Sequence, residues 1–175
     1  MAGLHGSGKS HLAKLLANEF DWQVINKLEI LEQIFIKHDN DDGICLQEWY
    51  GNLYRLKGAA QVMHMILDYI CVENKIILFD AIHNFEEWQV VQDLTGNQLL
   101  ALVVSPTIVT DSRNTPEDIA LDLKRVKYWH QADDGAKVCL ISNVEWVFNG
   151  AGEQDLLLAE GRALSKYLDQ QGWVV

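Results

Sequence analysis

The stretch Gly3-Leu4-His5-Gly6-Ser7-Gly8-Lys9-Ser10 decides the fold, because it matches the pattern G-x-x-x-x-G-K-[ST] at every position. In such a loop, glycines allow a tight turn in which several backbone N–H groups point at one anion. The helix that follows presents its unpaired first N–H groups and its positive dipole end to the same phosphates. We therefore expect a nucleotide to contact Gly3, His5, Gly6, Ser7, Gly8, Lys9, Ser10 and His11.

Two side chains of this loop have expected roles of their own. Lys9 would reach the β- and γ-phosphates, and the Ser10 hydroxyl would ligate Mg²⁺, so the expected cofactors are ATP and Mg²⁺. The alternative is a glycine-rich turn that only caps an ordinary helix. A full match directly before a helical segment favours the nucleotide-binding interpretation.

The segment in front of the loop is unusually short. A phosphate-binding loop normally follows a buried strand, yet only Met1 and Ala2 precede Gly3. The first strand is therefore expected to be missing or truncated. Three explanations stay open: further residues upstream, a misassigned start, or a sheet built without its middle strand.

The bulk properties limit the class of protein. The chain has 175 residues, enough for one well-buried α/β domain and short for two, and we expect a single domain over residues 1–175. A hydrophobic content of 49% with 22% charged residues is typical of a globular protein. The net charge of −11 argues against nucleic-acid and anionic-membrane surfaces, because phosphate-rich partners need a basic face.

Cysteine usage and hydropathy indicate the compartment. Cys45, Cys71 and Cys139 are widely spaced and form no C-x-x-C pair, so we expect reduced core residues rather than a disulfide or metal site. No apolar run approaches the roughly 18 residues of a membrane span, and no signal peptide is evident. These features predict a soluble, cytoplasmic protein.

Apolar spacing predicts helices and strands that alternate along the chain. Helices are expected over residues 10–20, 28–37, 85–94, 116–131 and 153–171. Strands are expected over residues 22–25, 75–80, 98–104 and 144–148. Residues 46–73 are one long helix or a pair broken near Gly58, and residues 133–142 are ambiguous between helix and strand. This alternation predicts a three-layer α/β/α domain with a parallel sheet.

A second part of the site is expected at Asp80. It ends the apolar run Ile76-Ile77-Leu78-Phe79, and ligands bind at the carboxyl ends of strands in open α/β sheets. A carboxylate there can hold Mg²⁺ opposite Ser10, as the paired motifs of P-loop enzymes do. The structural alternative is an aspartate that only caps the following turn.

Phosphoryl transfer also needs cations around the moving group. Arg113 lies in a polar segment where a closing lid is expected, Arg125 lies on the helix that follows, and Arg55 could clamp an acceptor phosphate. For each of the three, an exposed surface arginine is an equally good interpretation. We expect Arg162 to be a surface charge only.

With these residues in view, the chain resembles the nucleoside-monophosphate-kinase-like group of P-loop kinases, most closely the dephospho-coenzyme A kinases and the small AAA-labelled proteins related to them. The segment 77–84, followed by Glu86 and Glu87, looks like the apolar strand, turn and helix of that group. The segment 54–58 looks like the part that supplies an acceptor-binding arginine. The segment 144–150, including Asn149, is similar to the strand and turn that border the adenine.

The resemblance implies an ATP-dependent phosphotransferase with a parallel sheet of order 2-3-1-4-5 and a mobile lid. The acceptor side departs from the group. Asn26-Lys27-Leu28-Glu29 stands where an acidic acceptor site is usual, Ala81 replaces a turn glycine, and His83 replaces an arginine. The lid segment contains Arg113 as its single arginine.

The leading hypothesis is a kinase that transfers the γ-phosphate of ATP to a small nucleotide-like or other small-molecule acceptor. Lys9 and one lid cation, Arg113 or Arg125, would stabilise the transferring group. Asp80 would orient Mg²⁺ or the attacking hydroxyl, and Arg55 or His83 would hold the acceptor. The alternatives are an ATP-binding regulatory module that acts through a protein partner, and a degenerate kinase homologue.

Overall fold

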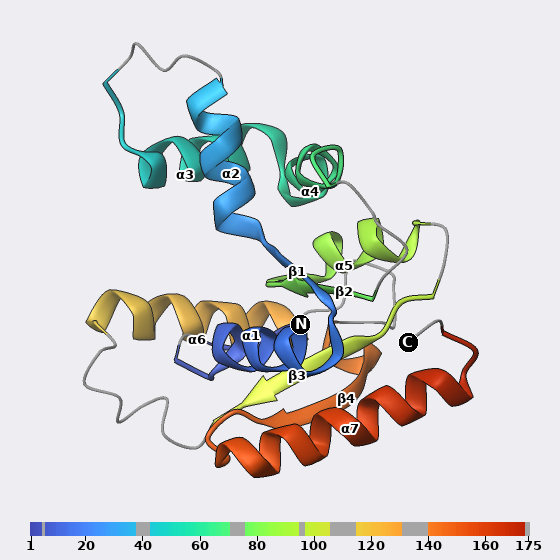
Figure 1. Ribbon diagram of the computed structural model, residues 1–175. Helices are drawn as coiled ribbons and strands as arrows, with labels where there is room; N and C mark the ends of the chain where they lie inside the picture. Colours follow the sequence, from blue (N-terminus) through green and yellow to red (C-terminus); the bar gives the residue numbers. More distant parts are fainter. Residues whose placement is uncertain are drawn as a thin grey trace.

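The computed structural model describes residues 1–4, 6–37, 43–70, 76–94, 97–105, 115–130 and 140–173, and for residues 117, 118, 125, 128 and 130 it describes the backbone alone. Within these ranges helices and strands alternate along the chain (Figure 1). The helices are α1 (Lys9–Phe20), α2 (Lys27–Lys37), α3 (Leu46–Lys57), α4 (Ala59–Leu67), α5 (Phe85–Gln92), α6 (Pro116–His130) and α7 (Gln154–Gln170). The strands are β1 (Gln23–Asn26), β2 (Ile77–Asp80), β3 (Leu100–Val104) and β4 (Val144–Asn149).

The predicted helices and strands are confirmed with bounds that differ by one or two residues, except that the helical segment expected over residues 46–73 ends at Leu67. The expected interruption near Gly58 is a true break: Gly58 has a φ of 78°, which favours glycine, and separates α3 from α4. Part of the ambiguous segment, Leu140–Asn143, is a short 3₁₀ turn, and residues 133–139 lie outside the described ranges.

The strands pair in parallel, as buried apolar runs predict. β1 pairs with β2 from Gln23↔Ile77 to Asn26↔Asp80. β3 pairs with β4 from Leu100↔Val144 to Val104↔Asn149, with one register shift.

Met1 and Ala2 connect these two strand pairs. The Met1 amino group donates to Phe79 O (2.6 Å), and Met1 O accepts from Ile82 N (2.9 Å). On the other side, Ala2 N donates to Ala101 O (2.8 Å) and Ala2 O accepts from Val103 N (2.9 Å). Ala2 thus forms an isolated parallel bridge with Leu102 where the strand before the loop is expected.

Side chains of β3 alternate between two hydrophobic cores, as the two-residue repeat of a strand requires. Ala101 and Val103 pack with apolar residues of α1 and α7, whereas Leu100 and Leu102 pack with apolar residues of α4, α5 and α6. β3 is therefore covered by helices on both faces.

A third core holds α2, α3 and α4 together on one side of the molecule, away from α7 (Figure 1). Its buried members are Ile25, Ile30, Leu31, Ile34, Leu53, Val62 and Ile66. This helical unit continues from β1, so its position fixes which side chains approach the carboxyl end of β2.

The structure describes one of the three cysteines, Cys45. Cys45 is exposed, because it precedes α3 at the surface, so the prediction of a core cysteine is wrong there. Cys71 and Cys139 lie outside the described ranges.

No helix in the described part of the chain is long and apolar enough to span a bilayer.

Gly161 of α7 lies at the contact between α7 and α1. A Cβ at Gly161 would overlap Leu16 Cδ2 and lie 3.2 Å from Phe20 Cε2, and Leu16 is fully buried. We expect Gly161→Ala to lower the free energy of unfolding by about 1–3 kcal/mol in urea denaturation, since overpacking forces the helices apart.

The matched control for that substitution is Gly51→Ala, in the exposed part of α3. A Cβ at Gly51 meets nothing within 4 Å, so this change should raise the free energy of unfolding by roughly 0.5–1 kcal/mol through helix propensity alone. Equal stabilisation by both substitutions would contradict the packing of α1 against α7.

Candidate functional site

The phosphate-binding loop has the backbone that its glycines predict. Gly6 and Gly8 have φ angles of 68° and 90°, a region that side chains rarely adopt. Gly8 immediately precedes α1 and supplies no side-chain cap, so the first N–H groups of α1 lack the usual side-chain acceptor. The Ser7 side chain is fully buried, and Ser7 N donates to Leu4 O (3.2 Å).

The turn after β4 lies directly against this loop. A Cβ at Gly150 would overlap Ser7 O, and a Cβ at Gly8 would lie 2.6 Å from Gly150 O, so both positions require glycine. Gly150 N donates to Val104 O (2.7 Å), which fixes the turn to the end of β3. The exposed residue Asn149 is therefore placed beside the loop, and its Oδ1 accepts from Ala151 N (3.2 Å).

Lys9 folds back over the loop. Its Nζ donates to Leu4 O (2.7 Å) and lies 3.5 Å from Ser7 Oγ. A main-chain carbonyl is a neutral acceptor, and hydrogen bonds from an ammonium to a charged acceptor are about twice as strong. A phosphate oxygen near the loop would therefore compete well for this ammonium.

The structure brings Ser10 and Asp80 together, although they are 70 positions apart in the sequence. Ser10 Oγ donates to Asp80 Oδ2 (2.8 Å), so the start of α1 meets the end of β2. The Asp80 side chain is buried, and its Oδ1 has no hydrogen-bond partner among the described residues. An unpartnered buried carboxylate oxygen is energetically costly.

This pair of residues fits Mg²⁺. Magnesium prefers oxygen ligands, usually one or two carboxylates together with phosphates and water. The free Oδ1 of Asp80 and the hydroxyl of Ser10 are such ligands, and a cation would satisfy the buried oxygen. No cluster of three or more His, Cys, Asp or Glu side chains suited to a metal occurs in the described ranges.

Several charged groups lie near the carboxyl end of β2. Burial lowers the pKa of the Met1 amino group to about 6; the Asp80 carboxylate opposes this shift, whereas the Lys9 and Lys27 ammonium groups add to it. The end of β2 is thus bordered by a carboxylate and two cations.

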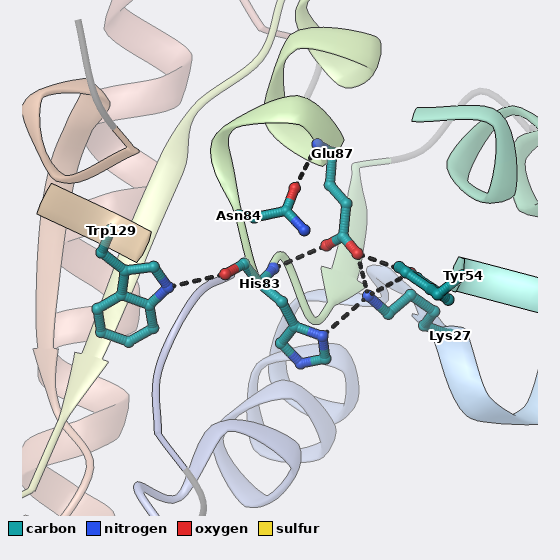
Figure 2. Close-up of polar contacts among 6 residues, drawn as sticks. All are labelled: Lys27, Tyr54, His83, Asn84, Glu87 and Trp129. Carbon is teal, nitrogen blue, oxygen red and sulfur yellow. Dashed lines mark hydrogen bonds and ion pairs between the residues drawn. The ribbon is translucent and has the colours of Figure 1, made fainter. Parts of the chain in front are cut away.

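A polar cluster lies next to the carboxyl end of β2, with Lys27 and Glu87 buried and Tyr54 and His83 half-buried. Figure 2 shows Lys27, Tyr54, His83 and Glu87 pointing toward one another from α2, α3, the β2–α5 connection and α5. Lys27 Nζ lies 2.9 Å from Glu87 Oε1, 3.1 Å from His83 Nδ1 and 3.3 Å from Tyr54 Oη. Tyr54 Oη also donates to Glu87 Oε1 (2.7 Å). We call these four residues the Lys27–Glu87 cluster.

Both main-chain groups of His83 are held as well. His83 N donates to Glu87 Oε2 (2.7 Å), and His83 O accepts from Trp129 Nε1 of α6 (2.9 Å; Figure 2). Asn84 caps α5, with Oδ1 accepting from Glu87 N (2.9 Å). His83 is therefore fixed through its backbone and its ring.

The protonation state of Tyr54 follows from its surroundings. Burial, and then the neighbouring Glu87 carboxylate, raise the pKa of the Tyr54 hydroxyl. Tyr54 therefore stays protonated at neutral pH and donates to Glu87. The Nδ1 atom of His83 lies opposite an ammonium, so we assign it as an acceptor.

Of the other sequence-predicted site residues, the structure describes the side chains of Arg55 and His11, and both are exposed. Arg55 is exposed, and its Nη2 donates to Asn52 Oδ1 (3.0 Å). His11 is exposed on α1. His5 and Arg113 lie outside the described ranges, and Arg125 is described on α6 by its backbone only. Arg162 is a surface charge as expected, paired with Glu19 (2.7 Å).

Sequence reasoning did not identify Lys27, Tyr54 or Glu87 as partners of His83. The signal was present at Glu87, but it is ambiguous, since Asn84-Phe85-Glu86-Glu87 has the spacing of a capping box. In that motif Glu87 would bond the Asn84 N–H, whereas here it bonds His83 N, Lys27 and Tyr54.

Comparisons with known proteins agree with this geometry at the level of the fold. No protein-family model matches the chain, and no curated protein matches it. A crystal structure of shikimate kinase from Aquifex aeolicus vf5 is similar with a TM-score of 0.51 and 12% sequence identity, covering 95% of this chain and 94% of that one. The chain therefore has a P-loop kinase-like fold.

Proposed function

We propose that this protein is an ATP-dependent phosphotransferase that moves the γ-phosphate of ATP to a small-molecule acceptor. The observation that carries the proposal is the contact between Ser10 and Asp80 (2.8 Å) beside a complete phosphate-binding loop. In P-loop enzymes a loop hydroxyl and a strand-end carboxylate together hold the metal ion of the nucleotide.

The nucleotide side is supplied by the loop and α1. Backbone N–H groups of residues 6–11 would bind the phosphates, and the Lys9 ammonium would exchange Leu4 O for phosphate oxygens. Asn149 would border the base, because its neighbour Gly150 contacts the loop.

Ser10 and Asp80 would hold Mg²⁺, which neutralises charge on the phosphates. The Ser10 hydroxyl would offer an oxygen lone pair to the ion while its hydrogen still bonds Asp80 Oδ2. We further propose that Arg113 and Arg125 supply the cations around the transferring group, and that a single domain over residues 1–175 carries the whole site.

The acceptor would lie beside the end of β2, between the α2–α4 unit and the loop. His83 would contact the acceptor, because it follows Asp80 by three residues and its backbone is held in place by Glu87 and Trp129. The proposal includes one parallel sheet between two helical layers, in the order β1, β2, residues 1–2, β3, β4. This is the order 2-3-1-4-5 when residues 1–2 are counted as the first strand. The hydrogen bonds of Met1 and Ala2 to both strand pairs, and the two cores around β3, support that arrangement.

A second candidate function is a module that binds ATP and changes its affinity for a protein partner. The exposure of Arg55, which points to Asn52 rather than to the acceptor side, favours this alternative. Such a module would bind ATP through the same loop without a small-molecule product.

The proposed reaction is tested by incubating the protein with Mg²⁺, ATP labelled on the γ-phosphate and a panel of hydroxyl compounds, nucleotides and coenzyme A precursors. We expect one class to become labelled, and Lys9→Ala to abolish both ATP binding and labelling. ATP binding without any labelled product across the panel would contradict the phosphotransferase and leave the regulatory module.

The metal pair gives a separate prediction. Because Ser10 and Asp80 provide the protein oxygens for Mg²⁺, we expect Ser10→Ala and Asp80→Asn to lower the Mg²⁺-dependent turnover of ATP by about 100-fold. Nucleotide affinity in EDTA should change little, since the loop glycines and Lys9 are unchanged.

The control for Asp80→Asn is Asp93→Asn, the same substitution at an exposed position after α5. It should leave turnover unchanged. Retention of wild-type Mg²⁺ dependence in Asp80→Asn would show that the metal ion is held elsewhere.

A further inference from the structure

The Lys27–Glu87 cluster contains an ion pair that is almost completely buried, with 2% of Lys27 and none of Glu87 exposed. Its polar groups are well matched. The three ammonium protons of Lys27 have three acceptors in Tyr54 Oη, His83 Nδ1 and Glu87 Oε1. Glu87 accepts from Lys27 and Tyr54 at Oε1 and from His83 N at Oε2.

Stability alone does not explain this arrangement. The desolvation cost of two buried charges offsets much of their attraction, and apolar pairs of similar size are often equally stable or more so. What charged hydrogen bonds add is direction, because each bond requires its partners at a set distance and angle. The cluster is therefore expected to fix a geometry.

The geometry that it fixes is the divergence of β1 and β2. The paired register of these strands ends at Asn26↔Asp80. Beyond that pair, the segment after β1 enters α2 at Lys27, and the segment after β2 continues to His83. The contacts of Lys27 with His83 and Glu87 thus hold these two segments together directly after the last registered pair.

His83 transmits this restraint to Asp80. Its N–H, carbonyl and ring are bound by Glu87, Trp129 and Lys27, which belong to three different helices. Only two residues separate His83 from Asp80. Ile82 between them is buried, and its N–H donates to Met1 O (2.9 Å), so the short segment has little freedom.

We propose that Lys27, Tyr54 and Glu87 are positioning residues that act through His83 on the segment 80–83 and hold the Asp80 carboxylate in place for a nucleotide-bound Mg²⁺ ion. This inference rests on the proposed function, because it requires MgATP to bind at the loop. None of the three residues needs to contact ATP, the metal ion or the acceptor.

The test compares ATP affinity with and without Mg²⁺ by isothermal titration calorimetry, which needs no turnover. The principal variant is Lys27→Met/Glu87→Gln, which removes both charges together and leaves an amide oxygen to accept from His83 N. We expect the dissociation constant of ATP in Mg²⁺ to rise about 10–100-fold, the range typical of residues that orient a metal ligand. The dissociation constant in EDTA should stay within about twofold of wild type, since the loop is untouched.

The matched control is Arg162→Met/Glu19→Gln, which removes an exposed ion pair between α7 and α1 by the same kinds of substitution. It should change neither dissociation constant. Tyr54→Phe keeps both charges and removes one hydroxyl, so it should fold even where the double variant does not. In Mg²⁺ we expect it to weaken ATP binding by about two- to tenfold.

The outcomes separate this inference from the proposed function. Wild-type Mg²⁺ enhancement of ATP binding in the cluster variants would overturn the positioning role and leave the phosphotransferase standing. Equal weakening in Mg²⁺ and in EDTA would also overturn it, because the cluster would then support only the loop or the fold. Failure of the wild-type protein to bind ATP at all would remove the proposed function together with this inference.

Discussion

The hydrogen bond from Ser10 Oγ to Asp80 Oδ2 is the contact on which the rest of the site depends. It joins the first turn of α1 to the last residue of β2, so the phosphate-binding loop and the strand-end carboxylate become one site. The loop side is shaped by glycine at positions 8 and 150, where the backbones approach too closely for a side chain. The Asp80 side is buried and retains an oxygen without a partner in the described part of the chain, which a bound cation or a hydrogen-bond donor would satisfy.

The two sides of the site differ in how they are built. On the nucleotide side, Lys9 donates to a neutral main-chain carbonyl, which phosphate can replace, and α1 begins without a side-chain cap. Beyond the carboxyl end of β2, Lys27, Tyr54, His83 and Glu87 form a network whose donors and acceptors match one another. A ligand gains less by replacing such partners. The loop is therefore suited to binding, whereas Lys27, Tyr54 and Glu87 are suited to holding His83 and its neighbours in position.

The parts of this account that could be predicted from sequence are local or periodic. The loop, the apolar run ending at Asp80 and the helix cap at Asn84 each depend on residues close in the chain. The Lys27–Glu87 cluster could not be predicted in this way, because it joins residues 27, 54, 83 and 87 through the fold. At α3 the choice between Arg55 and Tyr54 is a matter of helix rotation. Adjacent residues point about 100° apart, so once Tyr54 faces Glu87, Arg55 must face elsewhere.

The most direct test of the central claim is a crystal structure of the protein with Mg²⁺ and a non-hydrolysable ATP analogue. The account predicts a metal ion held by the Ser10 hydroxyl and the Asp80 carboxylate, with Lys9 Nζ moved from Leu4 O to the phosphates. The Lys27–Glu87 cluster should be unchanged. A metal ion bound away from Asp80, or a nucleotide that leaves Lys9 on Leu4 O, would contradict it.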